Sequence, residues 1–219
     1  MRKYAIVSLV IILCLLIVPA AMARNEISVS TDYWMWDGDI EGEPIAGSSY
    51  VLSAEFSISS KLSLRYTGVF GEVDSIGGYP LSSFSIEPDT NYLTLHYWFN
   101  EYFNVSVGYM DKNITISDGY DSLDLIELRG IRFGIGGEWE VYNKLTVFGE
   151  LGYVPAAKAY LFGGFLMPVD TSAADFKIGV SYAVTGDFAI RGGYMASYMD
   201  IGGIETQVDG IFFGLSYDF

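Results

Sequence analysis

The sequence contains little of the chemistry that most metal sites and covalent catalysts need. Its 219 residues include one cysteine, one histidine, and 12 lysines and arginines against 27 aspartates and glutamates. One cysteine excludes an internal disulfide, and a single Cys and His are too few for a structural zinc site. The formal net charge of −15 repels a phosphate backbone, so nucleic acid is excluded as a partner.

Long hydrophobic runs are also missing after the N-terminus, although 51% of the residues are hydrophobic. No stretch there approaches the roughly 18 uninterrupted apolar residues that a membrane-spanning helix needs. Hydrophobicity is instead distributed along the chain, together with 25 glycines and 16% aromatic residues. This composition favours many short strands that are separated by turns.

The N-terminus is typical of a signal peptide. A basic dipeptide precedes an apolar run over residues 4–18, and Ala21-Met22-Ala23 follows as a small-residue cleavage pattern. We therefore predict a signal peptide over residues 1–23 and a mature domain over residues 24–219. Cys14 lies in the predicted leader, so the mature chain has no thiol for disulfides or catalysis.

The mature sequence alternates with a period of two residues. In residues 50–59 the even positions are large and apolar, whereas the odd positions include Ser53, Glu55 and Ser57. Residues 62–70 repeat the alternation after a three-residue connector, which predicts a β-hairpin. Ten such runs occur, at residues 27–35, 50–59, 62–70, 93–99, 103–109, 131–141, 145–153, 176–184, 188–194 and 211–219.

Short and long connectors alternate between these runs. Four hairpins share three-residue turns, and the longer connections are rich in Gly, Pro, Ser and Asp. We place these loops at roughly residues 37–49, 74–88, 112–125, 156–172 and 199–207. Because lipid does not tolerate open sheet edges, this rhythm is typical of a transmembrane β-barrel. We predict an all-β fold, a single antiparallel up-and-down transmembrane β-barrel of about ten strands, with eight strands or a soluble β-sandwich as alternatives.

The last run carries a resemblance to a known class. Residues 210–219, Gly-Ile-Phe-Phe-Gly-Leu-Ser-Tyr-Asp-Phe, are apolar at every second place and end in Phe219. This pattern resembles the C-terminal assembly signal of bacterial outer-membrane β-barrel proteins, and the whole chain resembles their small members of eight to ten strands. The resemblance implies location in the bacterial outer membrane, with outer-membrane lipid and the barrel assembly machinery as partners. It also implies that both termini and the short turns face the periplasm.

The polar parity of such a barrel faces its lumen and contains charges of both signs: Asp32, Glu55, Arg65, His96, Arg132, Glu138, Glu150, Asp175, Lys177 and Arg191. Five of these lie four residues from a short turn and predict one lumen ionic layer: Glu55, Arg65, His96, Glu138 and Arg191. The hairpin register places Glu55 opposite Arg65. Mutual pairing reduces the cost of desolvating charges in a narrow lumen. The layer either plugs the lumen or forms a charged constriction in a small pore.

Inward-facing glycines allow the same two interpretations. Gly152 and Gly214 are two of several glycines on the polar parity. They leave room either for a pore or for the long side chains of neighbouring arginines.

No catalytic residue, metal site or cofactor is predicted. His96 is expected to face inward near the periplasmic end, and a triad would have to combine it with Ser106 or Ser181 and with Glu138, without any nucleophile motif. Residues 37–43 begin like a calcium loop, but the twelfth position is not the glutamate that an EF-hand needs. We therefore interpret the acidic loops as a solvated rim, with a weak divalent site as the alternative.

A segment over residues 159–168 has no charge, which is unusual for an exposed loop. Three interpretations stay open: it continues a hairpin, folds into the barrel mouth as a hydrophobic gate, or contacts lipid or a partner surface. Tyr160, Phe162 and Phe165 are the candidate gate residues.

The favoured function is a structural or surface-interaction barrel with a charge-sealed lumen. The alternative is a narrow channel or carrier for small solutes, including hydrophobic ones, and a barrel enzyme is the third hypothesis. The sequence identifies neither an extracellular partner nor a solute.

Overall fold

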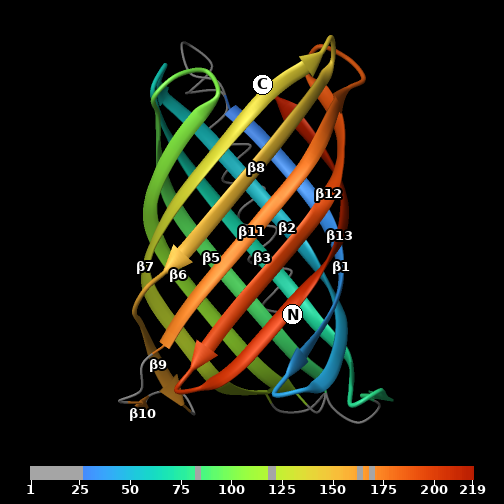
Figure 1. The fold of residues 1–219 in the computed structure, drawn as a ribbon, viewed down its shortest axis with the longest axis vertical. Coiled ribbons are helices and arrows are strands. Elements are labelled where there is room, and N and C mark those ends of the chain that lie inside the picture. Colours follow the sequence, from blue (N-terminus) through green and yellow to red (C-terminus); the bar gives the residue numbers. More distant parts are fainter. Residues whose placement is uncertain (1–26, 82–84, 118–121, 162–164, 168–170) are drawn as a thin grey trace.

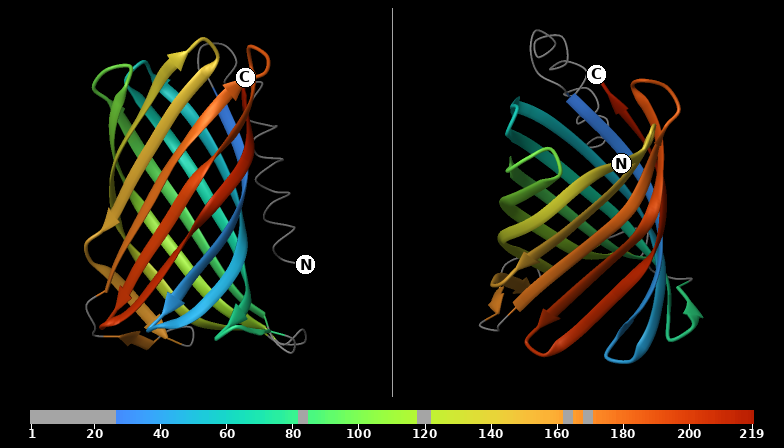
Figure 2. Two further views of the ribbon diagram at one scale, coloured as in Figure 1. Left: turned by 45° about the vertical axis from the view of Figure 1, so that its right-hand side comes forward. Right: turned by 45° about the horizontal axis from the view of Figure 1, so that its top comes forward.

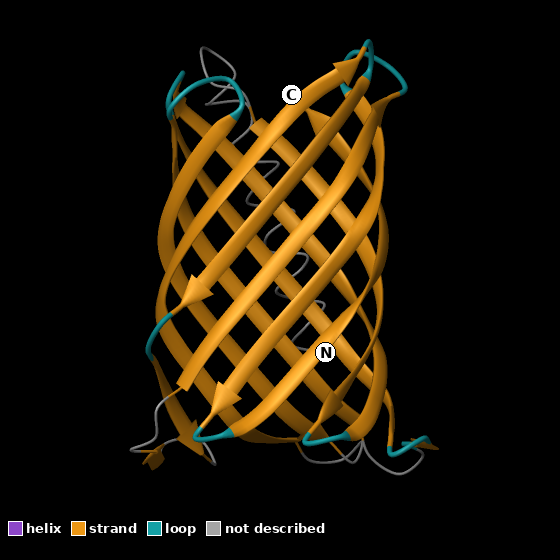
Figure 3. Ribbon diagram, in the orientation of Figure 1, coloured by secondary structure: helices purple, strands orange, loops and turns teal. Residues whose placement is uncertain are grey.

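The computed structural model describes residues 27–81, 85–117, 122–161, 165–167 and 171–219, and every regular element in them is a β-strand (Figure 3). The predicted signal peptide lies outside the described residues. Within the described part, no helix is long and apolar enough to cross a membrane.

The strands that form the wall are β1 (Ile27–Ile40), β2 (Glu43–Ser59), β3 (Leu62–Ile76), β5 (Ser85–Trp98), β6 (Phe103–Ser117), β7 (Ser122–Tyr142), β8 (Leu145–Val154), β9 (Ala157–Leu161), β11 (Thr171–Ala183), β12 (Phe188–Ile201) and β13 (Ile204–Asp218). Two short strands, β4 (Tyr79–Pro80) and β10 (Phe165–Met167), pair with β3 and β9. β8 and β9 both pair with β7, so they occupy one position in the wall.

The wall closes because β1 pairs with β13 from Ser28 to Ile40, antiparallel like the other pairings (Figure 1). The result is a closed antiparallel barrel of ten strands, which confirms the predicted fold class and strand number. A circuit of paired residues that starts at Leu128 of β7 returns to that strand at Glu140, so the stagger is 140 minus 128, or 12 residues. Such a stagger tilts the strands against the barrel axis, as Figure 2 shows.

The two ends of the barrel are distinguished by where the first strand begins and the last strand ends. β1 begins and β13 ends at the same end, drawn at the top of Figure 1 and called here the termini end. The four predicted short turns lie at this end, at residues 60–61, 99–102, 143–144 and 184–187. The opposite end is called the far end.

The predicted long loops at the far end are wrong, because most of their residues extend the strands. β1 and β2 stay paired to Ile40 and Glu43, which leaves two turn residues, Glu41 and Gly42, with φ of 53° and 86°. Gly202 and Gly203 join β12 to β13 in the same way, with φ of 63° and 93°. Two-residue turns with positive φ match the right-handed twist of paired strands. The glycines of these two segments therefore form tight turns that end long hairpins.

The outward face of the wall is apolar. On β6, Phe103, Val105, Val107 and Tyr109 are 49, 36, 45 and 48% exposed, whereas the intervening Asn104 and Ser106 are buried. Apolar side chains exposed in this way on successive strands form a continuous band, which is stable in hydrocarbon and unfavourable in water. The parity that the sequence indicated is therefore apolar outside and polar inside.

Candidate lumen site

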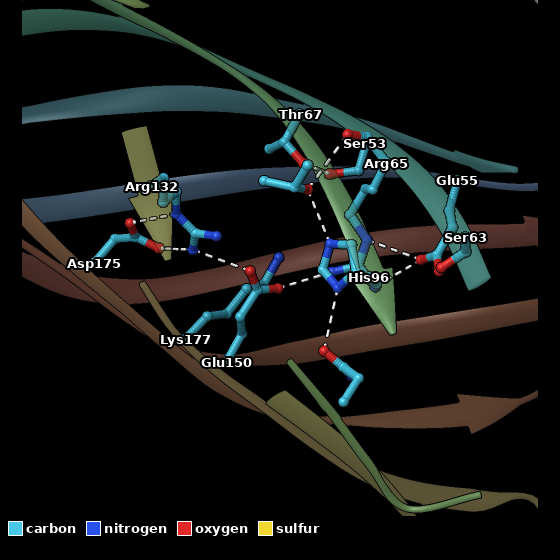
Figure 4. Close-up of polar contacts among 12 residues, drawn as sticks. Ser53, Glu55, Ser63, Arg65, Thr67, His96, Arg132, Glu150, Asp175 and Lys177 are labelled. Carbon is cyan, nitrogen blue, oxygen red and sulfur yellow. Dashed lines mark hydrogen bonds and ion pairs between the residues drawn. The ribbon is translucent and has the colours of Figure 1, made fainter. Parts of the chain in front are cut away.

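A chain of ion pairs crosses the lumen between opposite walls. Arg65 on β3 donates from Nη2 to Glu55 Oε2 of the neighbouring β2 over 2.6 Å, in the register that the turn length predicts. Its Nη1 donates to Glu150 Oε2 over 2.7 Å. Glu150 lies on β8, which three strands separate from β3 in the wall. The Arg65–Glu150 pair therefore spans the interior of the barrel (Figure 4).

The chain continues through Arg132 of β7. Its Nη2 contacts Glu150 Oε1 at 3.0 Å, and the guanidinium also contacts both carboxylate oxygens of Asp175, at 3.0 and 2.5 Å. A side chain at Gly152 would overlap the Arg132 guanidinium, so this glycine provides the room in which Arg132 lies. Of the two interpretations of the inward glycines, this position fits the one in which they accommodate arginine.

A second group of charges surrounds Asp32 of β1, whose side chain is fully buried. Lys177 Nζ donates to Asp32 Oδ2 over 2.7 Å, and Arg191 Nε lies 3.3 Å from Asp32 Oδ1 without the geometry of a hydrogen bond. A side chain at Gly214 would overlap the Asp32 carboxylate. The two groups together contain four cations and four anions, so their charges balance.

Aromatic rings lie against the cations of this network. Lys177 Nζ lies 4.6 Å from the centroid of Phe212, Arg191 Cζ lies 4.5 Å from that of Phe148, and Arg132 Cζ lies 5.1 Å from that of Tyr92. The negative face of an aromatic ring attracts a desolvated cation. The rings thus stabilise the guanidinium and ammonium groups.

The five residues of the predicted ionic layer are not all joined. Glu55 and Arg65 form an ion pair, whereas Arg191 pairs with Asp32. Glu138 has no ion pair within 4.0 Å among the residues that the structure describes, although Arg65 and Arg191 attract its carboxylate at longer range. His96 has none within the described ranges either. The charges therefore form the two groups described above, which are together called the ionic network.

His96 is held as a buried polar side chain. Its Nε2 lies 2.8 Å from Thr94 Oγ1, its Nδ1 lies 3.2 Å from Asn104 Oδ1, and the residue is 0% exposed. Both ring nitrogens thus have neutral partners. In the described part of the chain, no hydrogen bond joins His96 to Ser106, to Ser181 or to a carboxylate, so a triad is not assembled here.

The half of the lumen toward the far end is apolar, which was not predicted from the sequence. One buried cluster contains Trp34, Trp36, Ile45, Val51, Val73 and Phe212. A second contains Met110, Leu128, Val154, Ala157, Ala159, Ala173, Met199 and Ile201. Trp34 and Trp36 follow Asp32 on the same parity, so the continued inward alternation of β1 already contained this signal.

One cavity of about 1550 Å³ occupies the lumen. Its lining extends from Lys61 and Lys144 in turns of the termini end to Ile45 and Val208 in the apolar half, and it includes Arg65 and the other network cations. The space therefore continues past the ion pairs, although the Arg65–Glu150 pair crosses it.

The candidate gate segment mostly continues a hairpin in its described part. Tyr160 lies on β9, opposite Glu127 of β7, and its ring lies 5.8 Å from Arg129 Cζ and does not line the cavity. Phe165 lies on β10 and pairs with Leu161 through the backbone. Phe162 lies outside the described residues.

The acidic segment after Trp36 does not form a calcium loop. Asp37 and Asp39 are strand residues of β1, and Asp39 Oδ1 accepts a hydrogen bond from Gly42 N over 3.3 Å across the turn. Among the described residues, no group of three or more His, Cys, Asp and Glu side chains is placed to hold a metal ion.

These features define a class: a closed ten-stranded antiparallel barrel with an apolar outer face and a charged, partly hollow lumen. The chain resembles bacterial outer-membrane β-barrel proteins. No protein-family model matches the chain, and no curated protein matches it by sequence.

Solved structures to which the chain is similar include the outer membrane protease OmpT from Escherichia coli, with a TM-score of 0.49 and 9% identity over 89% of this chain and 96% of that one. Another is an outer membrane channel from Pseudomonas putida F1, with a TM-score of 0.47 and 11% identity over 89% and 95%. A third is Neisserial surface protein A, with a TM-score of 0.43 and 12% identity over 88% and 97%. The likeness concerns the architecture alone.

Proposed function

We propose that this protein is exported by a cleaved signal peptide to the bacterial outer membrane and forms a narrow route for small solutes there. The termini end faces the periplasm, and the far end faces the outside. The observation that carries the proposal is the cavity of about 1550 Å³ that continues past the ion pairs. A purely structural plug would fill the lumen with side chains, whereas this space exceeds that of most ligand sites.

The network would act as the constriction of this route. Its four cations and four anions balance, so it offers no strong preference for ions of one sign. The apolar half of the lumen favours solutes that carry an apolar part, because such solutes leave water on entering it. The proposal includes no catalytic step.

A second candidate is a structural or surface-interaction barrel whose lumen is sealed. The Arg65–Glu150 pair favours it, because this pair joins opposite walls and must separate before a large solute passes. The two candidates differ in one measurable property, which is permeability.

Conductance of the purified protein in a planar bilayer tests the proposal. We expect small unitary currents from the parent and larger ones from Glu150→Ala, because Glu150 contacts both Arg65 and Arg132. Asp187→Asn, in a turn of the termini end, is the matched control and is expected to conduct like the parent. Currents no larger than those of protein-free bilayers in both the parent and Glu150→Ala would contradict the proposal and favour the sealed barrel.

A further inference from the structure

Lys112 of β6 is a cation that the ionic network does not use. It lies opposite Thr90 of β5 and Leu128 of β7, both of which are buried, and its side chain lines the cavity. Within the described ranges, it forms no hydrogen bond and no ion pair within 4.0 Å. Every other lumen-facing cation of the barrel wall, from Arg65 to Arg191, has a carboxylate partner.

The surroundings of Lys112 are apolar. Met110 and Leu128 are 2% and 0% exposed, and Ile114 packs against the same cluster. Asp175 attracts the Lys112 ammonium at longer range, but its carboxylate already accepts from Arg132 at 2.5 and 3.0 Å. A cation without a partner beside apolar side chains is unfavourable, and an incoming anion relieves this cost.

The apolar half of the lumen provides the second part of a binding site. Trp36, Val73 and Met199 line the same cavity as Lys112. Trp34 also lines it, and its buried Nε1 has no hydrogen-bond partner in the described part of the chain. A cavity of this kind matches a molecule with one anionic group and an apolar body.

We propose that Lys112 and the apolar half of the lumen bind a small amphipathic carboxylate that enters from the far end. The carboxylate accepts from Lys112 Nζ, and the apolar body packs among Trp36, Val73 and Met199. The proposal deepens the solute route and rests on the same cavity. A cationic ligand would be repelled by Lys112, and a neutral one would leave its ammonium without a partner.

The acidic surplus of the chain opposes the approach of an anion. This electrostatic repulsion is short-ranged, because solvent-exposed charges are screened over about 8 Å at physiological ionic strength. The charge that selects the ligand is therefore the one inside the cavity, where screening is weaker.

Calorimetric titration of the full chain in nanodiscs with two probes tests the site. The probes are 1-naphthoate and the neutral 1-naphthalenemethanol, with empty nanodiscs as the blank for partition into lipid. We expect Lys112→Met to weaken 1-naphthoate binding about tenfold or more, because a charge-assisted contact is lost, and to change alcohol binding less than about twofold. Lys112→Arg is expected to retain 1-naphthoate binding. Lys158→Met, which removes an exposed lysine of β9 outside the cavity, is expected to bind like the parent.

Three results would overturn the site: equal effects of Lys112→Met on both probes, no effect on either, or no binding of 1-naphthoate by the parent. Flux of the two probes across liposomes that contain the parent protein distinguishes the failure of the binding site from the failure of the solute route. Flux without a Lys112-dependent charge preference supports the route and overturns the site. Charge-selective binding with flux no faster than in protein-free liposomes supports the site and contradicts the route.

Discussion

The size of a side chain constrains single positions in the lumen as much as its charge does. Gly152 lies beside the Arg132 guanidinium, and an added methyl group would overlap it. We expect Gly152→Ala to displace Arg132 from Asp175 and Glu150 and to cost roughly 2–4 kcal/mol of unfolding free energy, from overpacking and a broken buried pair. Urea unfolding of the protein in lipid vesicles, followed by tryptophan fluorescence, measures this cost.

Gly186→Ala is the control for this substitution, because a methyl group at Gly186 meets nothing within 4 Å. Its unfolding free energy should stay within about 0.5 kcal/mol of the parent value. Equal stability of the two variants would show that the Arg132 side chain relocates freely, in contrast to the geometry described above.

The Glu55–Arg65 pair leads to a second prediction. Arg65→Met removes the cation that Glu55 and Glu150 share, and both carboxylates are partly buried. Its removal should cost roughly 3–5 kcal/mol, whereas the double variant Glu55→Met with Arg65→Met should cost less than the sum of the single changes. A double-mutant cycle measures the coupling, and additive effects would contradict the pairing.

At this scale the sequence predicted the local pair and missed the distant one. Glu55 and Arg65 are joined by one hairpin, so counting from a short turn was sufficient to place them opposite each other. Glu150 reaches Arg65 across the lumen, and that contact depends on strand stagger and barrel width, which alternation does not encode. The same limit explains why Arg191 was placed in the layer of Arg65 and instead contacts Asp32.

Whole strands were predicted by type and number, but their lengths were underestimated. The alternating pattern predicted a first run that ends at residue 35, whereas β1 extends to Ile40. Polar and acidic residues such as Asp37 and Asp39 were interpreted as loop, because the apolar outward parity stops there. Paired strands can extend beyond an apolar band, since their backbone hydrogen bonds do not require it.

The two-residue turns at the far end hold these long hairpins in register. Gly203 has a φ of 93°, and a methyl group there would meet nothing within 4 Å, so any penalty of Gly203→Ala comes from the backbone alone. We expect about 1–2 kcal/mol of destabilisation. Gly203→Asn should retain more of the parent stability, because asparagine tolerates this conformation better. Denaturant titration distinguishes the variants, and a neutral Gly203→Ala would contradict this backbone geometry.

The barrel as a whole depends on its closing seam, where the last residue joins the first strand. Phe219 N donates to Ile27 O over 2.8 Å, and the Phe219 ring lies 4.6 Å from that of Tyr217. Closure removes the open edges that lipid does not tolerate, so the ten strands are stable in the membrane only when this seam forms. Because the last strand resembles an assembly signal, we propose a second role for Phe219, which is recognition by the assembly machinery.

The parent should therefore behave as a heat-modifiable barrel, with different gel mobility in unheated and boiled samples. Deletion of Phe219, or Phe219→Asp, should lower the folded fraction in outer membranes severalfold without changing synthesis, and Phe219→Tyr is the matched control that keeps a terminal ring. Refolding of the same purified variants into lipid vesicles separates the two roles. Recognition predicts normal folding in vesicles and poor assembly in cells, whereas a structural seam predicts a loss in both. Normal accumulation of the deletion variant in the outer membrane would contradict both roles, and the signal would then lie upstream of Phe219.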